Sequence, residues 1–362
     1  MKSRDARYTF PWALLIISLV AACDTATPDD PLPIVWEYAS TIELESLRVS
    51  EGGELFGNRR GSISWSSNNG SSWVEVFEGR ASVLGLGVGG TICTNDSEPG
   101  ALFRDAVIYC STDAGATWSR APDNSNFLGV DITAMELRDD GQLLVGTSGR
   151  VHQGGQAKPK RGLFVSSDLG QTWQETSLTT DDPLAGIEAS YSMDGGDLLV
   201  VRYQRLAITD NIAGYFRSID GGQTWEGLPK PPFDQFLVQA MSRSRDGAIY
   251  AAGAEAFPGV GRVDGVYSSV DLGESWTRTS FRSDREVLGA TALPDGRVIV
   301  SAGFDGVFVS DDHGSIWQAT NEGLPVSSIG TLDVSVRQLF AGPGFLFALT
   351  DQGLYRARLG GE

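Results

Sequence analysis

Few residues of this 362-residue chain have the chemistry of a nucleophile, a general base or a metal ligand. The sequence contains two histidines, His152 and His313, and three cysteines, Cys23, Cys93 and Cys110. Two histidines cannot build a histidine-rich metal site, and three cysteines cannot build a zinc ribbon, so we expect no metal and no cofactor. Serine or cysteine nucleophile chemistry has little support, because only the two histidines could act as its base.

Carboxylates are abundant and set the charge of the chain. The 46 Asp and Glu residues outnumber the 28 Lys and Arg residues, which gives a formal net charge of −18 at pH 7. This charge disfavours nucleic acid as a partner, because phosphate contacts need a basic surface. Two facing carboxylates can hydrolyse a glycosidic bond, but no sequence motif selects one pair among so many. With 41% hydrophobic and 20% charged residues, the composition is typical of a globular protein.

One eight-residue motif, Ser-x-Asp-x-Gly-x-x-Trp, occurs six times and indicates a repeat protein. Its third position holds Asn68, Asp113, Asp168, Asp220, Asp271 and Asp312, and its last position holds Trp73, Trp118, Trp173, Trp225, Trp276 and Trp317. The Asp or Asn side chain can accept hydrogen bonds from nearby backbone N–H groups, and the Gly allows a positive φ. We therefore expect a hairpin turn at each copy, with a structural role. Calcium is not expected, because one carboxylate per copy falls short of its six or more oxygens.

The motif resembles the Asp-box, or BNR repeat, of sialidase-like β-propellers, and Asn68 is the one departure from it. We call the eight residues of each copy an Asp-box motif; the copies begin at Ser66, Ser111, Ser166, Ser218, Ser269 and Ser310. The resemblance implies an all-β propeller in which each repeat is one blade of four strands. It also implies that the motifs lie on the rim away from the active site of that family.

The number of blades follows from the segments that lack a motif. After Trp317 the chain predicts three strands, 334–341, 345–350 and 353–358, but no further Asp-box motif. Residues 34–38 have the pattern of an outer strand, with Trp36 in the place of the motif Trp. We therefore expect a seven-bladed β-propeller whose ring is closed by the N-terminal strand joining the last blade. A six-bladed ring with an irregular tail is the alternative.

The loops between the second and third strands of the blades are predicted to differ in length. They are short at 58–61, 302–306 and 350–353, and long at about 94–106, 148–162, 202–214 and 254–265. Four consecutive long loops should form a raised crescent on the face opposite the Asp-box motifs. The crescent has eight basic and six acidic residues, against the charge of the chain. We expect it to bind an anionic ligand or an acidic protein surface through Arg104, Arg150, His152, Lys158, Lys160, Arg161, Arg202, Tyr203, Arg205 and Arg262.

The N-terminus has the composition of an export signal. Basic residues precede a short apolar run over 13–22, which is too short for a permanent membrane-spanning helix. Residues 20–23, Val-Ala-Ala-Cys, resemble the bacterial lipobox, which implies cleavage before Cys23 and its lipidation. The predicted organisation is a signal peptide over 1–22, a lipidated Cys and tether over 23–33, and one propeller domain over 34–362. We expect a protein anchored by lipid to a bacterial membrane, in the periplasm or on the cell surface.

Export also permits a disulfide between Cys93 and Cys110, which lie in neighbouring predicted strands. Two buried free thiols are the alternative, and the sequence does not decide between them.

Resemblances to characterised propellers suggest three functions. Sialidases carry their first substrate-binding arginine in a Phe-Arg-Ile-Pro motif that this chain lacks, so sialidase activity is not expected. Asp-box glycoside hydrolases that act on β-glucans usually have two propellers, whereas one is predicted here. The photosystem II assembly-factor family has a single seven-bladed propeller and serves as a scaffold. We therefore interpret the chain as a monomeric, membrane-tethered, non-catalytic scaffold or receptor that binds a protein or glycan at the cell envelope. A glycoside hydrolase with a carboxylate pair on the loop-rich face is the alternative.

Overall fold

The structure is a computed structural model in which residues 33–362 form one compact unit. It describes residues 33–97, 106–124, 127, 129–148, 160–182, 185–193, 198–205, 212–228, 236–257, 261–283, 286–328 and 331–360. The predicted signal peptide and most of the predicted tether therefore lie outside the described residues. Among the described residues, none belongs to a helix that is long and apolar enough to span a membrane.

The described strands form seven antiparallel sheets of four strands each. Blade 1 consists of β2 (Ser46–Val49), β3 (Leu55–Arg59), β4 (Ser62–Ser66) and β5 (Val74–Phe77), and blade 2 of β6 (Leu84–Leu86), β7 (Ile92–Ser97), β8 (Ala106–Ser111) and β9 (Ser119–Arg120). Blade 3 consists of β10 (Asp131–Leu137), β11 (Leu143–Ser148), β12 (Gly162–Ser166) and β13 (Gln174–Glu175), and blade 4 of β14 (Ala185–Met193), β15 (Leu198–Arg205), β16 (Ile212–Ser218) and β17 (Glu226–Gly227). Blade 5 consists of β18 (Phe236–Arg243), β19 (Ile249–Phe257), β20 (Gly261–Ser269) and β21 (Thr277–Arg278), and blade 6 of β22 (Gly289–Ala292), β23 (Val298–Ser301), β24 (Val307–Ser310) and β25 (Gln318–Ala319). Blade 7 consists of β26 (Val336–Gly342), β27 (Phe345–Thr350), β28 (Gly353–Arg358) and β1 (Trp36–Ser40).

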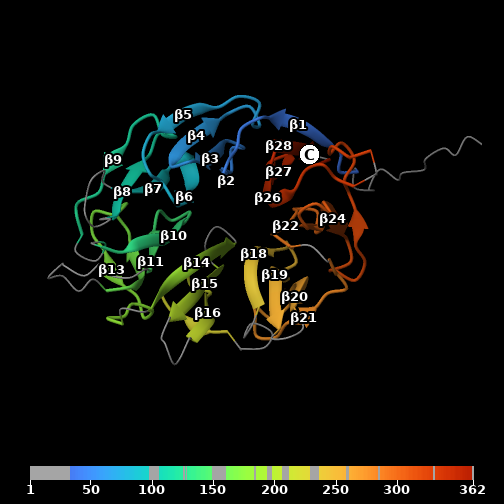
Figure 1. Ribbon diagram of the computed structural model, residues 1–362. Coiled ribbons are helices and arrows are strands. Elements are labelled where there is room, and N and C mark those ends of the chain that lie inside the picture. Colours follow the sequence, from blue (N-terminus) through green and yellow to red (C-terminus); the bar gives the residue numbers. More distant parts are fainter. Residues whose placement is uncertain are drawn as a thin grey trace, which may run out of the picture. The chain divides into compact units, whose positions relative to one another are not determined.

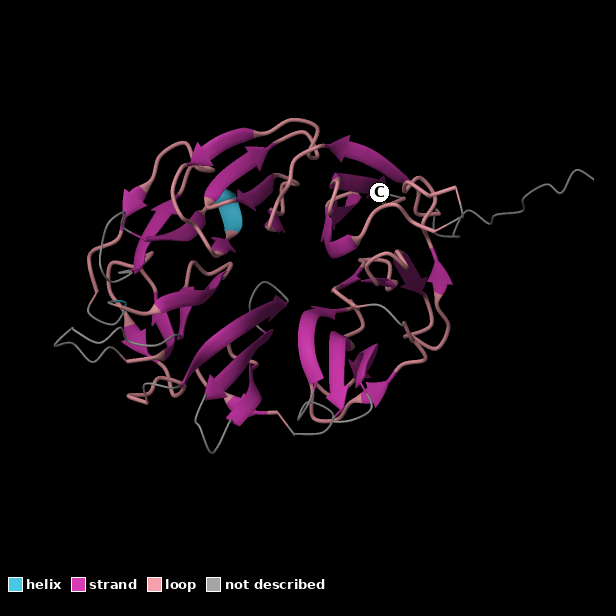
Figure 2. Ribbon diagram, in the orientation of Figure 1, coloured by secondary structure: helices cyan, strands magenta, loops and turns pink. Residues whose placement is uncertain are grey.

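The first strands of the blades surround a central axis (Figure 1). Strands β2, β6, β10, β14, β18, β22 and β26 contact one another in this order, and β26 contacts β2 again. Apart from the short helix η1 (Val88–Gly90), the regular structure of the described residues is entirely β (Figure 2). The predicted β-propeller is confirmed, and seven sheets fit the seven-bladed ring, because a six-bladed one would leave β26 to β28 over.

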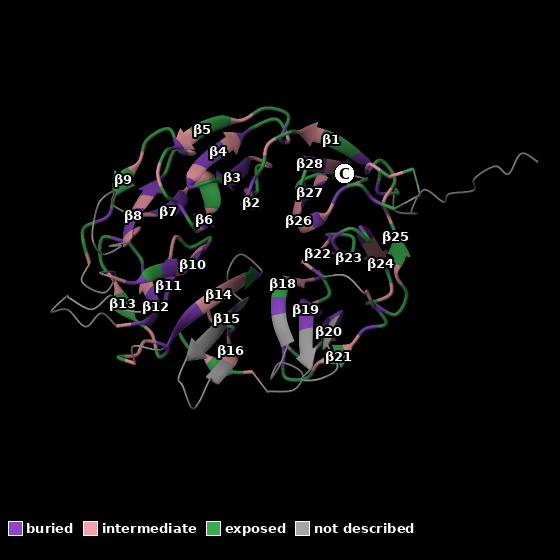
Figure 3. Cartoon of the chain, in the orientation of Figure 1, coloured by how far each residue is buried: buried purple, intermediate pink, exposed green. Residues whose placement is uncertain are grey.

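Burial decreases from the middle of each blade to its outer edge. All six residues of β11 are buried, because a second strand is covered by neighbouring blades on both of its faces. The outer strands β9, β13, β17 and β25 have two exposed residues each, and Figure 3 shows β25 as exposed. The seven hydrophobic clusters therefore lie between adjacent sheets, as in other face-to-face sheet packings.

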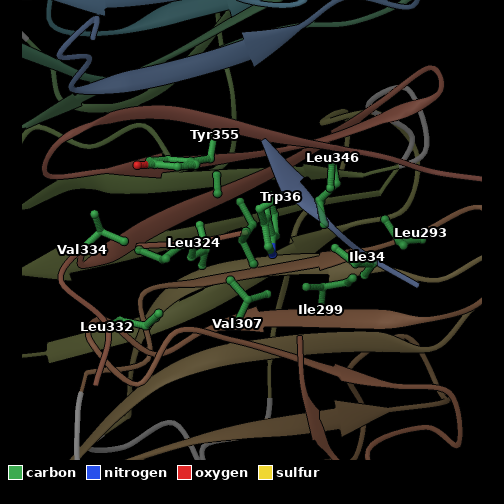
Figure 4. Close-up of a cluster of buried hydrophobic side chains, with 14 residues drawn as sticks. Ile34, Trp36, Leu293, Ile299, Val307, Leu324, Leu332, Val334, Leu346 and Tyr355 are labelled. Atoms are coloured by element: carbon green, nitrogen blue, oxygen red, sulfur yellow. The ribbon is translucent and has the colours of Figure 1, made fainter. Parts of the chain in front are cut away.

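The last blade is closed by the N-terminal strand. Strand β1 pairs antiparallel with β28, and Trp36 lies opposite Ala357. The Trp36 side chain is 3% exposed and packs among Leu324, Val307 and other residues of blades 6 and 7 (Figure 4). Its Nε1 donates a hydrogen bond to the carbonyl of Thr320 at 2.7 Å, so this one side chain joins the closing strand to blade 6.

We expect Trp36→Ala to lower the free energy of unfolding by about 3–5 kcal/mol, because it opens a cavity in this cluster and leaves a carbonyl without its donor. Urea denaturation followed by tryptophan fluorescence measures the loss. Val74→Ala is the matched control, since Val74 lies on the neighbouring outer strand β5 but is 58% exposed, and it should cost about 0.5 kcal/mol or less. Equal losses for the two variants would contradict the closing role of Trp36.

Candidate functional site

Each Asp-box motif is held by a short network of hydrogen bonds. In the third copy, Gly170 N donates to Ser166 Oγ at 2.8 Å, and Ser166 Oγ donates to Asp168 Oδ1 at 2.8 Å. Asp168 also accepts hydrogen bonds from the backbone N–H of Thr172 at 2.8 Å and from its hydroxyl at 2.6 Å. Asn68 replaces the aspartate in the first copy and accepts the equivalent backbone bond, from Ser72, at 2.9 Å.

These bonds favour the ionised form of the motif aspartates. The pKa of Asp113, Asp168 and Asp271 is lowered from 3.8 to about 2, mainly because a Thr or Ser hydroxyl four residues later donates to the carboxylate. Backbone N–H groups act in the same direction. The carboxylates are therefore engaged in the turns themselves, which supports a structural role for the motifs.

Four of the motifs also attach their blade to the one before it in the ring. Trp118 Nε1 of the second motif donates to the carbonyl of Val76 in blade 1 at 2.7 Å. Arginines from preceding blades donate to backbone carbonyls of three other motifs: Arg138 to Gly221 at 3.1 Å, Arg217 to Leu272, and Arg356 to Asn69 at 2.9 Å. The face that carries the motifs, which we call the Asp-box face, is thus a belt of contacts between blades.

A channel of about 450 Å³ runs between the first strands of the blades. Polar side chains from six blades line it: Ser46, Arg48, Glu136, Ser190, Ser192, Gln239, Ser242, Thr291 and Gln338. Hydroxyl and amide groups of this kind can hydrogen-bond a polar ligand, and the charged residues of the lining are Arg48, Glu136 and Asp139.

Glu136 is the most perturbed acid of the channel. Its Oε1 accepts a hydrogen bond from Ser190 Oγ at 2.8 Å. Burial raises the pKa of Glu136, while the positive charge of Arg48 and the hydrogen bond from Ser190 oppose the increase. Glu136 is the last but one residue of β10, next to the turn over 138–141, so it lies at the Asp-box end of the channel. A carboxyl with a raised pKa can act as a general acid, but this one is remote from the loop-rich face.

The channel residues were not predicted from the sequence. The sequence does contain a signal for the channel, because two charged residues lie inside first strands of blades. They are Arg48 in Ser-Leu-Arg-Val and Glu136 in Asp-Ile-Thr-Ala-Met-Glu-Leu. A charge in a strand otherwise rich in apolar residues indicates a polar cavity, once the strand is known to line an axis.

Several predicted crescent residues cannot be placed. Arg104, Arg150, His152 and Lys158 lie outside the described residues.

The remaining crescent residues show that two of the predicted loops are too long. Arg202, Tyr203 and Arg205 lie in β15, and Arg262 lies in β20. The prediction was wrong because the backbone pairing continues to Arg205↔Ile212 in blade 4 and to Phe257↔Gly261 in blade 5, beyond the point where the apolar pattern ends.

This pairing makes blades 4 and 5 taller than blade 6. The third strands β16, β20 and β24 all end at the Ser of an Asp-box motif but have seven, nine and four residues. The additional residues lie on the face opposite the Asp-box motifs, which we call the loop face. At about 3.3 Å per residue, they extend blades 4 and 5 beyond blade 6 by roughly 10–17 Å. We call this raised part, formed by β15, β16, β19 and β20, the loop-face ridge.

Two basic residues of the predicted crescent are already engaged in the fold. Lys160 Nζ lies 2.7 Å from Glu175 Oε2, and the hydrogen bond to Glu175 raises the pKa of Lys160. Arg161 is 1% exposed, and its backbone pairs with Thr180. The prediction that Arg161 binds a partner is corrected, because a buried guanidinium does not reach the surface.

The histidine and cysteine predictions can be followed in part. His313 lies within an Asp-box motif, its Nδ1 3.2 Å from Tyr250 Oη and 3.4 Å from Asp246 Oδ2, on the face where no active site was expected. Cys93 and Cys110 lie opposite each other on β7 and β8 and form a disulfide in the structure. No group of three or more His, Cys, Asp or Glu side chains among the described residues could hold a metal ion.

The closed ring and its polar channel define a single seven-bladed β-propeller. No family model matches the sequence, and no curated protein matches it. Solved propeller structures are similar to it at low identity. The GH74 xyloglucanase from Xanthomonas campestris has a TM-score of 0.63 and 14% identity, over 90% of this chain and 54% of the enzyme. The GH74 enzyme from Niastella koreensis has a TM-score of 0.60 and 18% identity, over 90% and 53%.

A third similar structure is that of YCF48 bound to D1 peptide, with a TM-score of 0.61 and 13% identity, over 92% of this chain and 98% of that chain. The chain thus spans about half the length of the GH74 enzymes and nearly all of YCF48. These similarities establish the fold.

The lowered pKa values predict how stability depends on pH. Because the folded-state pKa of the motif aspartates lies below 3.8, their stabilising effect is complete above about pH 4 and is lost as the pH falls towards 2. In the Asp168→Asn variant the side chain still accepts the backbone hydrogen bond but cannot titrate. The free energy of unfolding of this variant should therefore fall less steeply between pH 4 and 2 than that of the unmodified protein. Urea denaturation across this range measures the slope. Asn68→Asp adds a titrating group and should steepen it; parallel curves for all three proteins would disprove this account.

Proposed function

We propose that the protein is a lipid-anchored β-propeller of the cell envelope that binds an extended protein segment on its loop face without catalysing a reaction. The observation that carries the proposal is the asymmetry of that face. The ridge of blades 4 and 5 stands above blade 6, whereas the Asp-box face is occupied by contacts between blades. A raised wall beside a low rim provides a surface against which an extended segment can lie.

The comparisons support a protein partner. YCF48 matches this propeller over nearly the whole of both chains, and its structure was solved with a peptide bound. The GH74 enzymes match over about half of their own length, so a single propeller of this size corresponds to only part of such an enzyme.

The binding residues that we propose are those of the predicted crescent, now without Arg161. They are Arg104, Arg150, His152, Lys158, Arg202, Tyr203, Arg205 and Arg262. Lys160 also belongs to this set, although it forms an ion pair with Glu175. Their basic character within an acidic chain favours an acidic segment, because opposite charges steer association. The proposed anchor rests on the lipobox-like residues 20–23 and the lipidation of Cys23.

A glycoside hydrolase remains the second candidate because of Glu136. Burial raises its pKa, as general acids of glycosidases require, and GH74 enzymes share the fold. However, Glu136 lies at the Asp-box end of the channel, remote from the loop face, and interacts with the positive charge of Arg48. This position favours the binding function over the hydrolase.

The peptide-binding function can be tested with the full-length chain purified in detergent and a phage-displayed library of 12-residue peptides. We expect acidic peptides to be enriched, and Arg202→Glu with Arg205→Glu to weaken their binding at least tenfold, because charge reversal on the ridge repels them. Arg245→Glu is the matched control: Arg245 is exposed in a turn on the Asp-box face, so binding should stay within twofold. Enrichment of no peptide, or equal losses in both proteins, would refute binding on the loop face.

The hydrolase is tested with xyloglucan and mixed-linkage β-glucan as substrates. We expect no release of reducing sugar by the unmodified protein. Release that Glu136→Gln abolishes would overturn the non-catalytic proposal and assign Glu136 as the acid.

A further inference from the structure

The chain enters the propeller at the Asp-box face of blade 7. In six blades the outer strand follows the Trp of an Asp-box motif, and in blade 7 Trp36 takes that place, opposite Ala357 of β28. The two residues before Trp36 therefore stand where the other blades have the two motif residues before the Trp. Whatever precedes residue 33 is joined to this sector of this face.

The same sector carries two arginines beside the place that the motif occupies in the other blades. Arg356 donates through Nε to Glu37 Oε1 at 2.6 Å and through Nη1 to Asn69 and Ser71 of the first motif. Arg358, two residues further on, is exposed, and its guanidinium lies 5.4 Å from the ring centroid of Phe345. We call Phe345, Arg356 and Arg358 the basic sector.

The remainder of the Asp-box face is acidic. Five of the six motifs present an aspartate, and the depressed pKa of Asp113, Asp168 and Asp271 keeps them charged at any physiological pH. Arg245 is also exposed on this face, but it adjoins Asp246. The basic sector thus differs in charge from the rim around it and coincides with the entry point of the chain.

We propose that the basic sector rests on the anionic phosphate groups of the membrane that holds the lipidated Cys23. This inference rests on the lipid anchor of the proposed function. Ten residues, 24–33, separate Cys23 from Ile34, and even fully extended they reach only about 36 Å. The tether therefore keeps the domain within this distance of the membrane and lets it approach to the Debye length of about 8 Å, over which its surface charges interact with the lipid.

Two charge effects then orient the domain. Phosphates attract Arg358, whose cation–π contact with Phe345 holds it at the surface, and arginine suits phosphate groups. The same phosphates repel the acidic motifs of the other blades. Blade 7 consequently lies nearest to the membrane, and the loop face with its ridge points away from it, accessible to a partner.

The orientation is tested by energy transfer in vesicles that contain 30% phosphatidylglycerol and an acceptor dye on the lipid headgroups. The lipidated full-length chain is reconstituted with a donor dye at Gly360→Cys, beside the basic sector, or at Gln352→Cys, exposed on the loop face of the same blade. We expect at least twofold more efficient transfer from position 360. Equal transfer from both positions, or more from position 352, overturns the proposal.

The role of the arginine is tested by charge reversal. Arg358→Glu should abolish the difference in transfer between the two positions, because it replaces an attraction to phosphate by a repulsion. Arg59→Glu is the matched control: Arg59 is exposed at the loop-face end of β3, so the same change in net charge should leave the difference intact. Equal effects of the two variants would show that net charge alone acts, and would overturn the basic sector as a contact.

Mass spectrometry of the N-terminal peptide separates this inference from the anchor on which it rests. An unmodified Cys23 would refute the lipid anchor and with it the membrane contact. A lipidated Cys23 with equal transfer from both positions would refute the orientation alone and leave the proposed anchor standing.

Discussion

The ring depends on the pairing of β1 with β28, which joins the two ends of the propeller sequence. Each blade contacts only its two neighbours, so an unclosed ring would expose the β28 edge and the apolar faces of blades 6 and 7. The pairing of Trp36 with Ala357, together with the Trp36 hydrogen bond to Thr320, fills this gap. The channel, the loop face and the Asp-box face all exist only because the seven first strands return to their starting point.

The repeated part of this fold was predictable because its chemistry is local. An Asp or Asn that accepts N–H groups within four residues, followed by a Gly with positive φ, specifies a turn without any help from the remainder of the chain. Gly170 has a φ of 88°, a conformation that few other residues adopt. The closing strand was predictable for the same reason, since Trp36 repeats the packing role of a motif Trp.

The candidate site was predictable only in part, because it depends on contacts between distant segments. Arg48 and Glu136 face one channel although 88 positions separate them along the chain, and no local pattern records that arrangement. Arg161 looked like part of a basic loop, but its side chain is buried in the blade. The ridge was mistaken for two loops because polar residues such as Arg202 and Arg205 break the apolar alternation while their backbone pairing continues. Cross-strand pairing, rather than composition, decided where those strands end.

The structure places contacts between blades on one face and the differences in strand length on the other. On the Asp-box face the side chains of Arg138, Arg217 and Arg356 are committed to carbonyls of the next blade, so a change there affects the ring before it affects any ligand. The loop face carries the differences in strand length, and blades 4 and 5 are extended there without any change at the motif end. A propeller can therefore vary one face while conserving the belt that closes it. If the chain is held to a membrane, attachment at the belt is the arrangement that leaves the variable face unobstructed, and the entry of the chain beside Trp36 follows this arrangement.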